Sequence, residues 1–393
     1  MTIRQVTKED QVQFDKIQSI AFEFPYDLKV NEDFDGKGCI GAFDDDGTLF
    51  AEMGVIDHTM YFSGHEVKSA GIGGVASLPH YRHNKGIRKV FEYVFDKMQE
   101  DDQVFSMLFP FSFSYYNKFG YETVYRKMEM SFDFGCFEHL PRNNSVKMVE
   151  ERDCEDIQKL YEQYARKHNC ALKRNEDLWK KHLPEISTKD KKYTYVYYRE
   201  DGTAGGYFTF TPEQDGDSKT MKMHAFVFLE KSDLLGILGF LRNYEANYSS
   251  VSIANIPESE DFSSVFINQY DVSRNISYNA MARVADVARA FELMRYPMGE
   301  GSFTVGVTDE FLERNNGIYS VAYKDGTAVS VSKPNEGCAD LEVDVKALAK
   351  LMLGTDDLLS YHMGFANGIK INANEEVLGK TFVKQSIFLG DYF

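Results

Sequence analysis

The sequence predicts an α+β protein of about two to three domains, and three observations support this prediction. The chain has 393 residues, of which 43% are hydrophobic, so it is long enough to bury several cores. Segments that read as strands are interspersed with amphipathic segments of helical spacing. The aromatic content is 14%, with 31 Phe and 24 Tyr, which suits wide sheets built from aromatic strands.

The first predicted unit, residues 1–142, begins with a strand and a capped helix. Thr7 is a good N-cap residue, and Glu9 and Asp10 follow it in the first turn. The acidic turn Asp44–Gly47 predicts a hairpin. The expected elements are strand Thr2–Val6, a helix from Thr7 to Ala21, strands Cys39–Phe43, Thr48–Ile56 and Glu66–Ser77, helix Asn84–Met98, and strands Val104–Phe109 and Thr123–Phe134.

The same order of elements partly restarts at Val146, which predicts a second copy over residues 143–280. The segment Leu229–Lys231, between the last hairpin strand and the next helix, lacks glycine and a series of basic residues, so we expect this copy to be structural. The expected elements are strand Val146–Val149, helix Glu155–His168, hairpin Tyr193–Phe210, strand Thr220–Phe228, helix Ser232–Tyr244 and strand Ser250–Ala254.

A third unit, residues 281–393, is expected to start with a helix around Met281–Val284. Its ending, Phe382–Phe393, is largely apolar to the last residue, whereas chain ends normally fray in solvent. This pattern predicts a buried or docked C-terminus. The other expected elements are strands Gly301–Val307, Gly317–Ala322, Ala328–Lys333 and Ala339–Val343, and helices Val345–Leu353 and Asp356–Met363.

The charge of the chain bears on its partners. It contains 61 Asp and Glu against 44 Lys and Arg, a formal net charge of −17. A nucleic-acid binder gains affinity from clustered Lys and Arg that release counterions, so we expect no nucleic-acid partner. An acidic surface concentrates cationic ligands, although net charge also serves solubility alone.

The cysteines and the N-terminus bear on the compartment. The chain has five cysteines, an odd number with no C-x-x-C pair, so neither a disulfide framework nor a zinc knuckle is indicated. The N-terminus lacks a basic segment followed by an apolar one, and no stretch approaches about 18 uninterrupted apolar residues. We therefore expect a cytoplasmic protein with no membrane anchor.

The segment Gly73–Arg88 contains the most informative motif. It lies between a strand and an amphipathic helix, where backbone N–H groups at the helix start are unpaired and the helix dipole adds partial positive charge. Arg82, Lys85 and Arg88 add full charges, so the junction is suited to a pyrophosphate. The pattern alone leaves open an ordinary turn followed by a solvated basic helix start.

Two motifs together resemble the acetyl-CoA-binding half of GNAT acetyltransferases. Segment 82–88 is similar to the Arg/Gln-x-x-Gly-x-Gly/Ala loop that holds the pyrophosphate. Segment 116–121 is similar to the stretch in which a Tyr precedes a Phe-Gly-Tyr/Phe turn. If the loop is aligned on Gly86, His83 stands at the Arg/Gln position; if it is aligned on Arg82, Lys85 stands where glycine belongs. We prefer the first register because it keeps a glycine in the tight turn.

The whole chain resembles the Eis (enhanced intracellular survival) family of GNAT N-acetyltransferases, and the resemblance includes the ending Asp391-Tyr392-Phe393. It implies tandem GNAT-like domains, each a mixed sheet with flanking helices, plus a sterol carrier protein-like α/β C-terminal domain. Residues 1–142 would be the catalytic domain, residues 143–280 a degenerate structural domain, and residues 281–393 the domain that supplies a C-terminal carboxylate.

The resemblance implies acetyl-CoA as co-substrate, no metal, and a set of site residues. The backbone of Val75, Ala76 and Ser77 would pair with the pantetheine arm. Tyr116 would be the general acid, and the α-carboxylate of Phe393 the general base. The residues implied around the rest of the cofactor are Arg82, His83, Asn84, Lys85, Gly86, Ile87 and Arg88 at the pyrophosphate, with Phe111 and Ser112 on the far side.

The proposed chemistry needs these groups. Attack of an amine on a thioester requires a neutral amine, so a carboxylate must accept a proton, and the departing thiolate needs a donor. Without the family resemblance, Tyr116 and Phe393 would be interpreted as core residues. His80 and His83 form no metal constellation, and no basic surroundings mark Cys39 as a nucleophile; the same holds for Cys136.

For the acceptor, Glu23, Asp27 and Glu52 are expected to line an acidic, aromatic pocket suited to polycations. Solvated surface acids are the alternative interpretation. The resemblance implies a broad pocket for aminoglycosides, polyamines or lysine-like amines.

We therefore predict an N-acetyltransferase that works by direct attack, and the resemblance implies a homo-oligomer, usually a hexamer. The alternative is a lipid or acyl-CoA binding protein whose GNAT half is a scaffold. A third possibility is an acyltransferase that uses a longer acyl donor.

Overall fold

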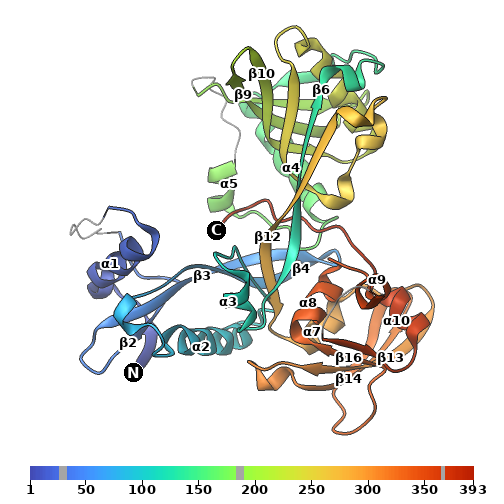
Figure 1. Cartoon of the computed structure of the whole chain (residues 1–393). Helices are drawn as coiled ribbons and strands as arrows, with labels where there is room; N and C mark the ends of the chain where they lie inside the picture. The colour runs from blue at the N-terminus through green and yellow to red at the C-terminus, as the bar shows by residue number, and fades with distance from the viewer. Residues whose placement is uncertain (26–32, 183–189, 364–367) are drawn as a thin grey trace.

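The computed structural model describes residues 1–25, 33–182, 190–363 and 368–393. Figure 1 shows three bodies: an N-terminal one in blue and cyan, a green and yellow one above it, and an orange and red one beside the first. The described residues form two sheets. One has twelve strands in the order β1-β2-β3-β4-β5-β12-β6-β11-β10-β9-β8-β7, and the other has five in the order β15-β14-β13-β16-β17. Strands and helices mix in each body, so the predicted α+β class is confirmed.

The first domain builds its core between β2–β5 and the helix α2. Helix α2 buries Val90, Phe91, Val94 and Phe95 along one face, as its helical spacing predicts. Gly47 has a φ of 87° in the turn between β2 and β3, as the acidic turn motif predicts. The elements are β1 Thr2–Gln5, α1 Gln11–Phe22, β2 Cys39–Phe43, β3 Leu49–Phe62, β4 His65–Ser77, α2 Gly86–Glu100, β5 Phe105–Leu108, α3 Phe113–Asn117 and β6 Glu122–Asp133.

The second domain repeats the arrangement with its own core of aromatic and aliphatic side chains on β8–β11 and α6. Helix α5 was not predicted, because its short, charged sequence has little apolar periodicity. The elements are β7 Val146–Met148, α4 Cys154–Ala165, α5 Glu176–His182, β8 Tyr193–Tyr198, β9 Ala204–Asp215, β10 Ser218–Phe228, α6 Lys231–Leu241, β11 Ser250–Pro257 and β12 Val272–Val284.

The third domain packs its five-stranded sheet against α8, which also contacts β6 and β12 of the large sheet. Helix α8 begins at Val345 and ends at Leu353, as predicted, with Asp344 as its N-cap and Gly354 as its C-cap. The elements are α7 Val287–Leu293, β13 Glu300–Thr308, β14 Gly317–Lys324, β15 Thr327–Ser332, β16 Leu341–Asp344, α8 Val345–Leu353, α9 Leu358–Met363, β17 Ile369–Ile371 and α10 Glu375–Thr381.

The expected helix at Met281–Val284 is wrong. These residues end strand β12, which pairs antiparallel with both β5 and β6. The run Ala280–Val284 is buried throughout, so it lacks the alternation that marks a half-exposed strand, and periodicity cannot separate such a run from a helix. The predicted boundary at residues 280 and 281 falls inside this strand; the domain limits themselves stay predictions.

The long strands β6 and β12 connect the first and second domains, as both views show. Strand β6 pairs with β12 on one side and β11 on the other. Within the described residues, no helix is long and apolar enough to cross a membrane.

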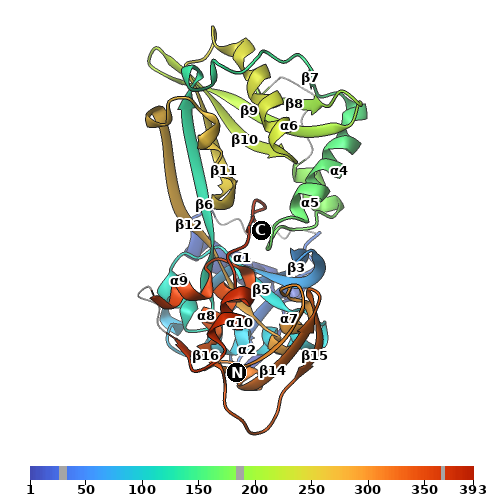
Figure 2. The same ribbon diagram turned by 90° about the vertical axis from the view of Figure 1, so that its right-hand side faces the viewer.

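The C-terminal segment leaves the third domain and runs between the other two, where the end of the chain is marked in Figure 2. Leu389 and Asp391 are buried, and the apolar ending predicted to dock does so.

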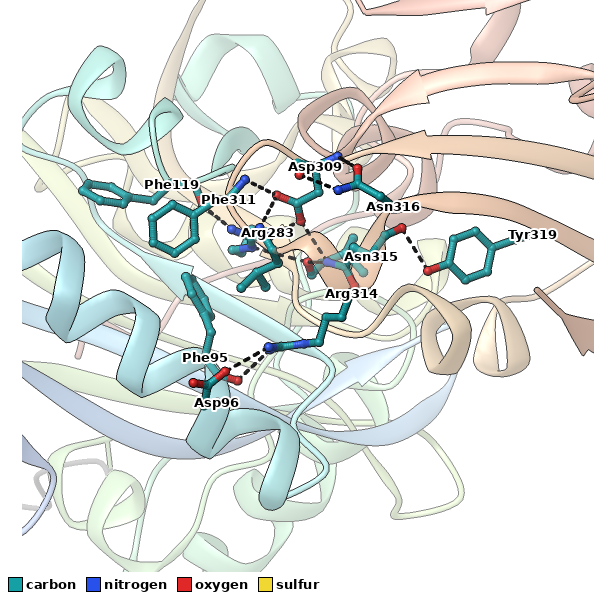
Figure 3. A network of polar contacts seen from close by, with 12 residues as sticks. Phe95, Asp96, Phe119, Arg283, Asp309, Phe311, Arg314, Asn315, Asn316 and Tyr319 are labelled. Atoms are coloured by element: carbon teal, nitrogen blue, oxygen red, sulfur yellow. Dashed lines mark hydrogen bonds and ion pairs between the residues drawn. The ribbon is translucent and has the colours of Figure 1, made fainter. Parts of the chain in front are cut away.

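A buried ionic network joins the third domain to the first (Figure 3). The Arg283 guanidinium on β12 donates to the carboxylate of Asp309 and to the carbonyl of Phe119, and all of its side chain is buried. Asp309 also accepts from the backbone N–H of Phe311 at 3.0 Å. Arg314 donates to the carbonyl of Phe95 at 2.7 Å, on α2. The third domain therefore supports the helix and the turn that border the predicted cofactor site.

Candidate active site

Strand β4 has a bulge near its C-terminal end. Glu52 pairs with Ala76 and Gly54 with Gly73, so two residues of β4 lie opposite one residue of β3. Gly74 sits in this bulge with a φ of 56°, a conformation that favours glycine. On its other side, β4 pairs in parallel with β5 only as far as Ile72. Because β5 ends at Leu108, the backbone of residues 75–77 has no strand partner on that side.

A cavity of about 820 Å³ opens from this gap between β4 and β5. Its lining joins the end of β4, the following loop, the start of α2 and the segment around α3. The lining residues are Ala21, Phe22, Phe50, Ala51, Val75, Ala76, Ser77, Tyr81, Arg82, His83, Lys85, Gly86, Ile87, Arg88, Phe111, Tyr115, Lys118 and Phe119. Ten of the twelve predicted cofactor residues are in this set, and Asn84 and Ser112 are the two that are not.

The start of α2 has the features of an anion site. His83 and Lys85 take left-handed backbone conformations, with φ of 74° and 61°, while the N–H groups of Arg82 and Asn84 donate to carbonyls within the loop. No side chain caps the helix, so its first N–H groups keep their hydrogen-bonding capacity. Arg82, Lys85 and Arg88 bring positive charge to the same cavity wall.

The expectation that Gly86 serves the tight turn is wrong. Gly86 has no positive φ, and the left-handed residue beside it is Lys85. Gly86 is needed for a different reason, because a Cβ there would collide with the ring of Phe50 and press on Ala51. Gly86 thus allows β3 and α2 to approach each other closely. Lys85 takes the left-handed conformation that a glycine would adopt without strain.

Tyr116 on α3 is 4% exposed and does not belong to the residues that line the cavity. Its ring packs edge-on against Phe111 and Tyr115, with ring centres 5.3 and 5.2 Å away. Burial raises the pKa of the Tyr116 hydroxyl, so it keeps its proton at neutral pH. The cavity itself is lined by its neighbour Tyr115.

Phe393, the last residue, lies against β4 next to the bulge. A terminal oxygen of Phe393 lies 3.7 Å from the position that a Cβ on Gly73 would take. The phenyl ring fills the space over Gly71, next to His58 and Phe109, with ring centres 4.8 and 5.1 Å away. Burial lowers the pKa of His58 to about 4, so this neighbour is neutral.

The acids expected to bind the acceptor lie in unlike surroundings. Glu23 is exposed at the end of α1, and Asp27 lies outside the described residues. Glu52 on β3 is fully buried. Gln18 donates to Glu52 Oε1 at 2.7 Å and to the carbonyl of Gly74 at 2.8 Å, while Glu52 Oε2 has no hydrogen-bond partner among the described residues.

Burial raises the pKa of Glu52 to about 9, against the weaker opposing effect of the Gln18 hydrogen bond. Its carboxyl is therefore neutral at pH 7. Burial and the nearby Glu52 also raise the pKa of the Cys39 thiol to about 11, which fits the prediction that Cys39 is not a nucleophile.

Three residues at the site were not predicted: Phe22, Tyr115 and Asp391. Phe22 is 51% exposed at the cavity mouth, an unusual position for a large apolar side chain. Tyr115 would have been found from its position beside the motif tyrosine. Asp391 depends on contacts with residues more than 200 positions away, so no local signal marks it.

Known domain families match the chain in three places. Residues 2–124 match a family described as an acetyltransferase (GNAT) domain, and residues 170–284 match a second family of the same description. Residues 287–384 match a sterol carrier protein domain. No match was found among curated proteins.

Solved structures share the fold along the whole chain. A GCN5-related N-acetyltransferase from Anabaena variabilis has a TM-score of 0.82 at 20% identity, with 100% of both chains covered. A probable N-acyltransferase from Enterococcus faecalis has 0.81 at 21% identity, covering 100% of this chain and 99% of the other. Eis1 from Mycobacterium abscessus has 0.82 at 16% identity, with 100% of both covered.

The two acetyltransferase domains and the open junction at β4 and α2 define an N-acetyltransferase of the GNAT class. A sterol carrier protein domain follows them, and the chain shares the fold of Eis1 over its full length.

Proposed function

We propose that the protein transfers an acetyl group from acetyl-CoA to a primary amine by direct attack, with Tyr116 as general acid and the Phe393 carboxylate as general base. The observation that carries the proposal is the position of that carboxylate against Gly73, at the bulge where the open edge of β4 begins. A base and the donors needed for acyl transfer then converge on one short segment of strand.

The cavity fits the co-substrate, which would supply the acetyl thioester. Its lining offers an open strand edge at Val75–Ser77, an uncapped helix start and four cationic side chains. We assign the pantetheine arm to that edge by strand addition. We assign the pyrophosphate to residues 82–88, including Asn84, and the far side to Phe111 and Ser112.

The Phe393 carboxylate would accept the proton of the attacking amine. An α-carboxyl has a reference pKa of about 3.5, so it is ionised at neutral pH and acts mainly through its position. Backbone N–H groups of residues 75–77 have no strand partner on the cavity side, so they are available to a developing oxyanion. The Tyr116 hydroxyl, held neutral by burial, would donate to the departing sulfur.

We propose Glu23, Asp27 and Glu52 for the acceptor side, with different roles. The exposed carboxylate of Glu23 suits direct contact with a cationic amine. Glu52 is buried and would act through Gln18, which holds the carbonyl of Gly74 in the bulge. The acceptor class is an aminoglycoside, a polyamine or a lysine-like amine.

A cytoplasmic homo-oligomer, a hexamer as in the resembling family, completes the proposal. All five cysteines are free, which supports a reducing compartment. Light scattering on the purified protein tests the assembly, and a monomer at micromolar concentration contradicts it.

The test of function is steady-state CoA release from acetyl-CoA with a panel of polyamines and aminoglycosides. Deleting Phe393 moves the carboxylate by one residue, a shift of about 3.5 Å along the chain. We expect kcat to fall on the order of 100-fold and the KM for acetyl-CoA to stay within about twofold. The matched control is Tyr392→Phe, which keeps the chain end in place. Lipid retained by the purified protein, with no turnover on any amine, would instead favour a lipid or acyl-CoA carrier.

A further inference from the structure

The C-terminal segment is fixed by the second domain before it reaches the first. The backbone N–H of Asn169 donates to the carbonyl of Ser386 at 2.8 Å, and that of Phe388 donates to the carbonyl of Asn169 at 3.0 Å. The His168 ring bonds to the hydroxyl of Ser386 at 2.6 Å. These contacts align residues 386–388, the first part of what we call the tail (residues 386–393), with the segment between α4 and α5.

Asp391 is the strongest attachment point of the tail. Its carboxylate is fully buried and accepts from the Tyr161 hydroxyl at 2.8 Å. Arg174 donates through Nε at 3.0 Å and approaches with Nη2 at 2.8 Å. His182 Nε2 lies 2.9 Å from the same carboxylate. All three partners belong to the second domain, on α4, on α5 and in the connection between them.

The partners of Asp391 are themselves held in place. The Arg174 guanidinium stacks over the ring of Tyr161 at 3.7 Å and near that of Trp179 at 5.0 Å. Burial would raise the pKa of Asp391, but the His182 hydrogen bond and the charge of Arg174 hold it at about 2. The carboxylate is therefore ionised at working pH, and an unpaired charge would remain buried if either side of the pair were removed.

The tail lies at the opening between β10 and β11. These strands pair in parallel only up to Met223 and Ile253, as β4 and β5 do in the first domain. Beyond that point a cavity of about 100 Å³ is lined by Phe226 of β10, Asn255 of β11, and Phe388 and Gly390 of the tail. In the first domain, the gap beyond the paired parallel strands opens to the proposed cofactor site. In the second domain, the corresponding gap faces the tail.

We propose that the second domain is a socket for the tail, and that Asp391, held by Arg174, Tyr161 and His182, is a positioning residue for the Phe393 carboxylate. The inference rests on the proposed role of that carboxylate as base. It gives the second domain a part in the reaction without any contact with substrate. Only Tyr392 separates Asp391 from Phe393, so freedom at Asp391 is passed to the carboxylate.

The test compares Asp391→Asn and Arg174→Met with Tyr392→Phe as the matched control. Tyr392 lies beside Asp391 but is 58% exposed, and its hydroxyl bonds only to Asn279 among the described residues. We expect the two socket variants to lose about 10- to 100-fold in kcat, because misplacing a catalytic group by about 1 Å has effects of this size. The KM for acetyl-CoA should stay within about twofold.

Two further measurements separate positioning from general damage. In a chain that already lacks Phe393, Asp391→Asn should cause no further loss of kcat, since its effect runs through that carboxylate. On the folded protein, carboxypeptidase should release Phe393 at least about tenfold faster from Asp391→Asn than from the control. A full additional loss in the truncated background, or unchanged release, would overturn the socket.

The outcomes also separate this inference from the proposed function. Full activity in Asp391→Asn, together with a large loss on deletion of Phe393, overturns only the socket. Full activity after deletion of Phe393 overturns the base as well, and with it the positioning role.

Discussion

The two GNAT domains place a helix after the same kind of open strand edge, but the two helix starts have opposite chemistry. Helix α2 has no side-chain cap and faces a cavity with Arg82, Lys85 and Arg88. Helix α6 has a capping box, in which the side chains of Glu230 and Asp233 take up the first N–H groups.

The two helix starts therefore differ in the groups that meet them. The carboxylate of Asp233 is fully buried and is bound by Arg199 Nη2 at 2.6 Å. The start of α6 is thus covered by the protein's own side chains, whereas the start of α2 faces a cavity.

The two domains also differ in the hydrogen bonding of the polar groups beside their strand bulges. In the first domain, Glu52 beside the bulge is buried with one carboxyl oxygen unsatisfied. In the second, Ala225 after the bulge pairs with Thr209, whose hydroxyl bonds to that of Thr194 at 2.9 Å. The first domain therefore has a buried polar atom without a hydrogen-bond partner among the described residues, whereas the threonine hydroxyls beside the second bulge bond to each other.

The largest effect should come from the buried ion pairs. Asp309→Ala leaves the fully buried Arg283 without its charged partner, so we expect the free energy of unfolding to fall by about 3–5 kcal/mol. Asp233→Ala removes a cap and a partner of Arg199, which is 30% exposed, so about 1–2 kcal/mol should be lost. Urea denaturation measures both. Equal losses would contradict the difference in burial.

The pH dependence of stability should reveal the buried Glu52 beside the bulge of the first domain. The folded-state pKa of Glu52, about 9, is above its ordinary value of 4.5. Between these values the folded protein keeps a proton that the unfolded chain releases, so this group makes stability fall as pH rises. Glu52→Gln should therefore become more stable than the parent by on the order of 2–4 kcal/mol at pH 8, with little difference near pH 4.

Thermal unfolding from pH 4 to pH 9 measures this change, with the exposed Glu23→Gln as the matched control. A constant difference across the pH range would show that Glu52 is ionised in the folded protein.

The smallest effect concerns the loop at the start of α2. Lys85→Gly relieves a left-handed lysine, which should raise the free energy of unfolding by about 1 kcal/mol. The same change removes a cation from the cavity, so the KM for acetyl-CoA should rise about three- to tenfold. Lys118→Gly should not have the same stabilising effect, because Lys118 does not take a left-handed backbone conformation. A stabilised variant with unchanged KM would show that Lys85 does not face the pyrophosphate.

Local patterns predicted much of the fold. Strand Cys39–Phe43 and helix Val345–Leu353 have the predicted bounds, because a turn motif fixes the first and an acidic cap and a glycine delimit the second. Strand β12 was missed where its sequence is apolar on both faces. Its partners β5 and β6 lie more than 130 residues earlier in the chain, and only that pairing distinguishes the strand from a helix.

The cavity could be located from the sequence because its motif is contiguous. Most of its predicted residues lie in one stretch between Val75 and Arg88, where spacing and charge have local meaning. The attachment of Asp391 could not be found this way, since Tyr161 and Arg174 are brought to it by the packing of three domains. Gly86 was wrongly expected in the tight turn because composition does not reveal which loop residue takes a positive φ, and Lys85 takes it.

The pairing of β12 between β5 and β6 has a consequence for how such a chain can evolve. The large sheet is continuous across the two acetyltransferase domains, and a strand late in the sequence lies between two early ones. A gene segment that encoded only the first repeat would leave β5 and β6 with exposed, sticky edges. Exchange of either repeat alone would therefore break the pairing of β12 with β5 and β6, so we expect the two repeats to be inherited together.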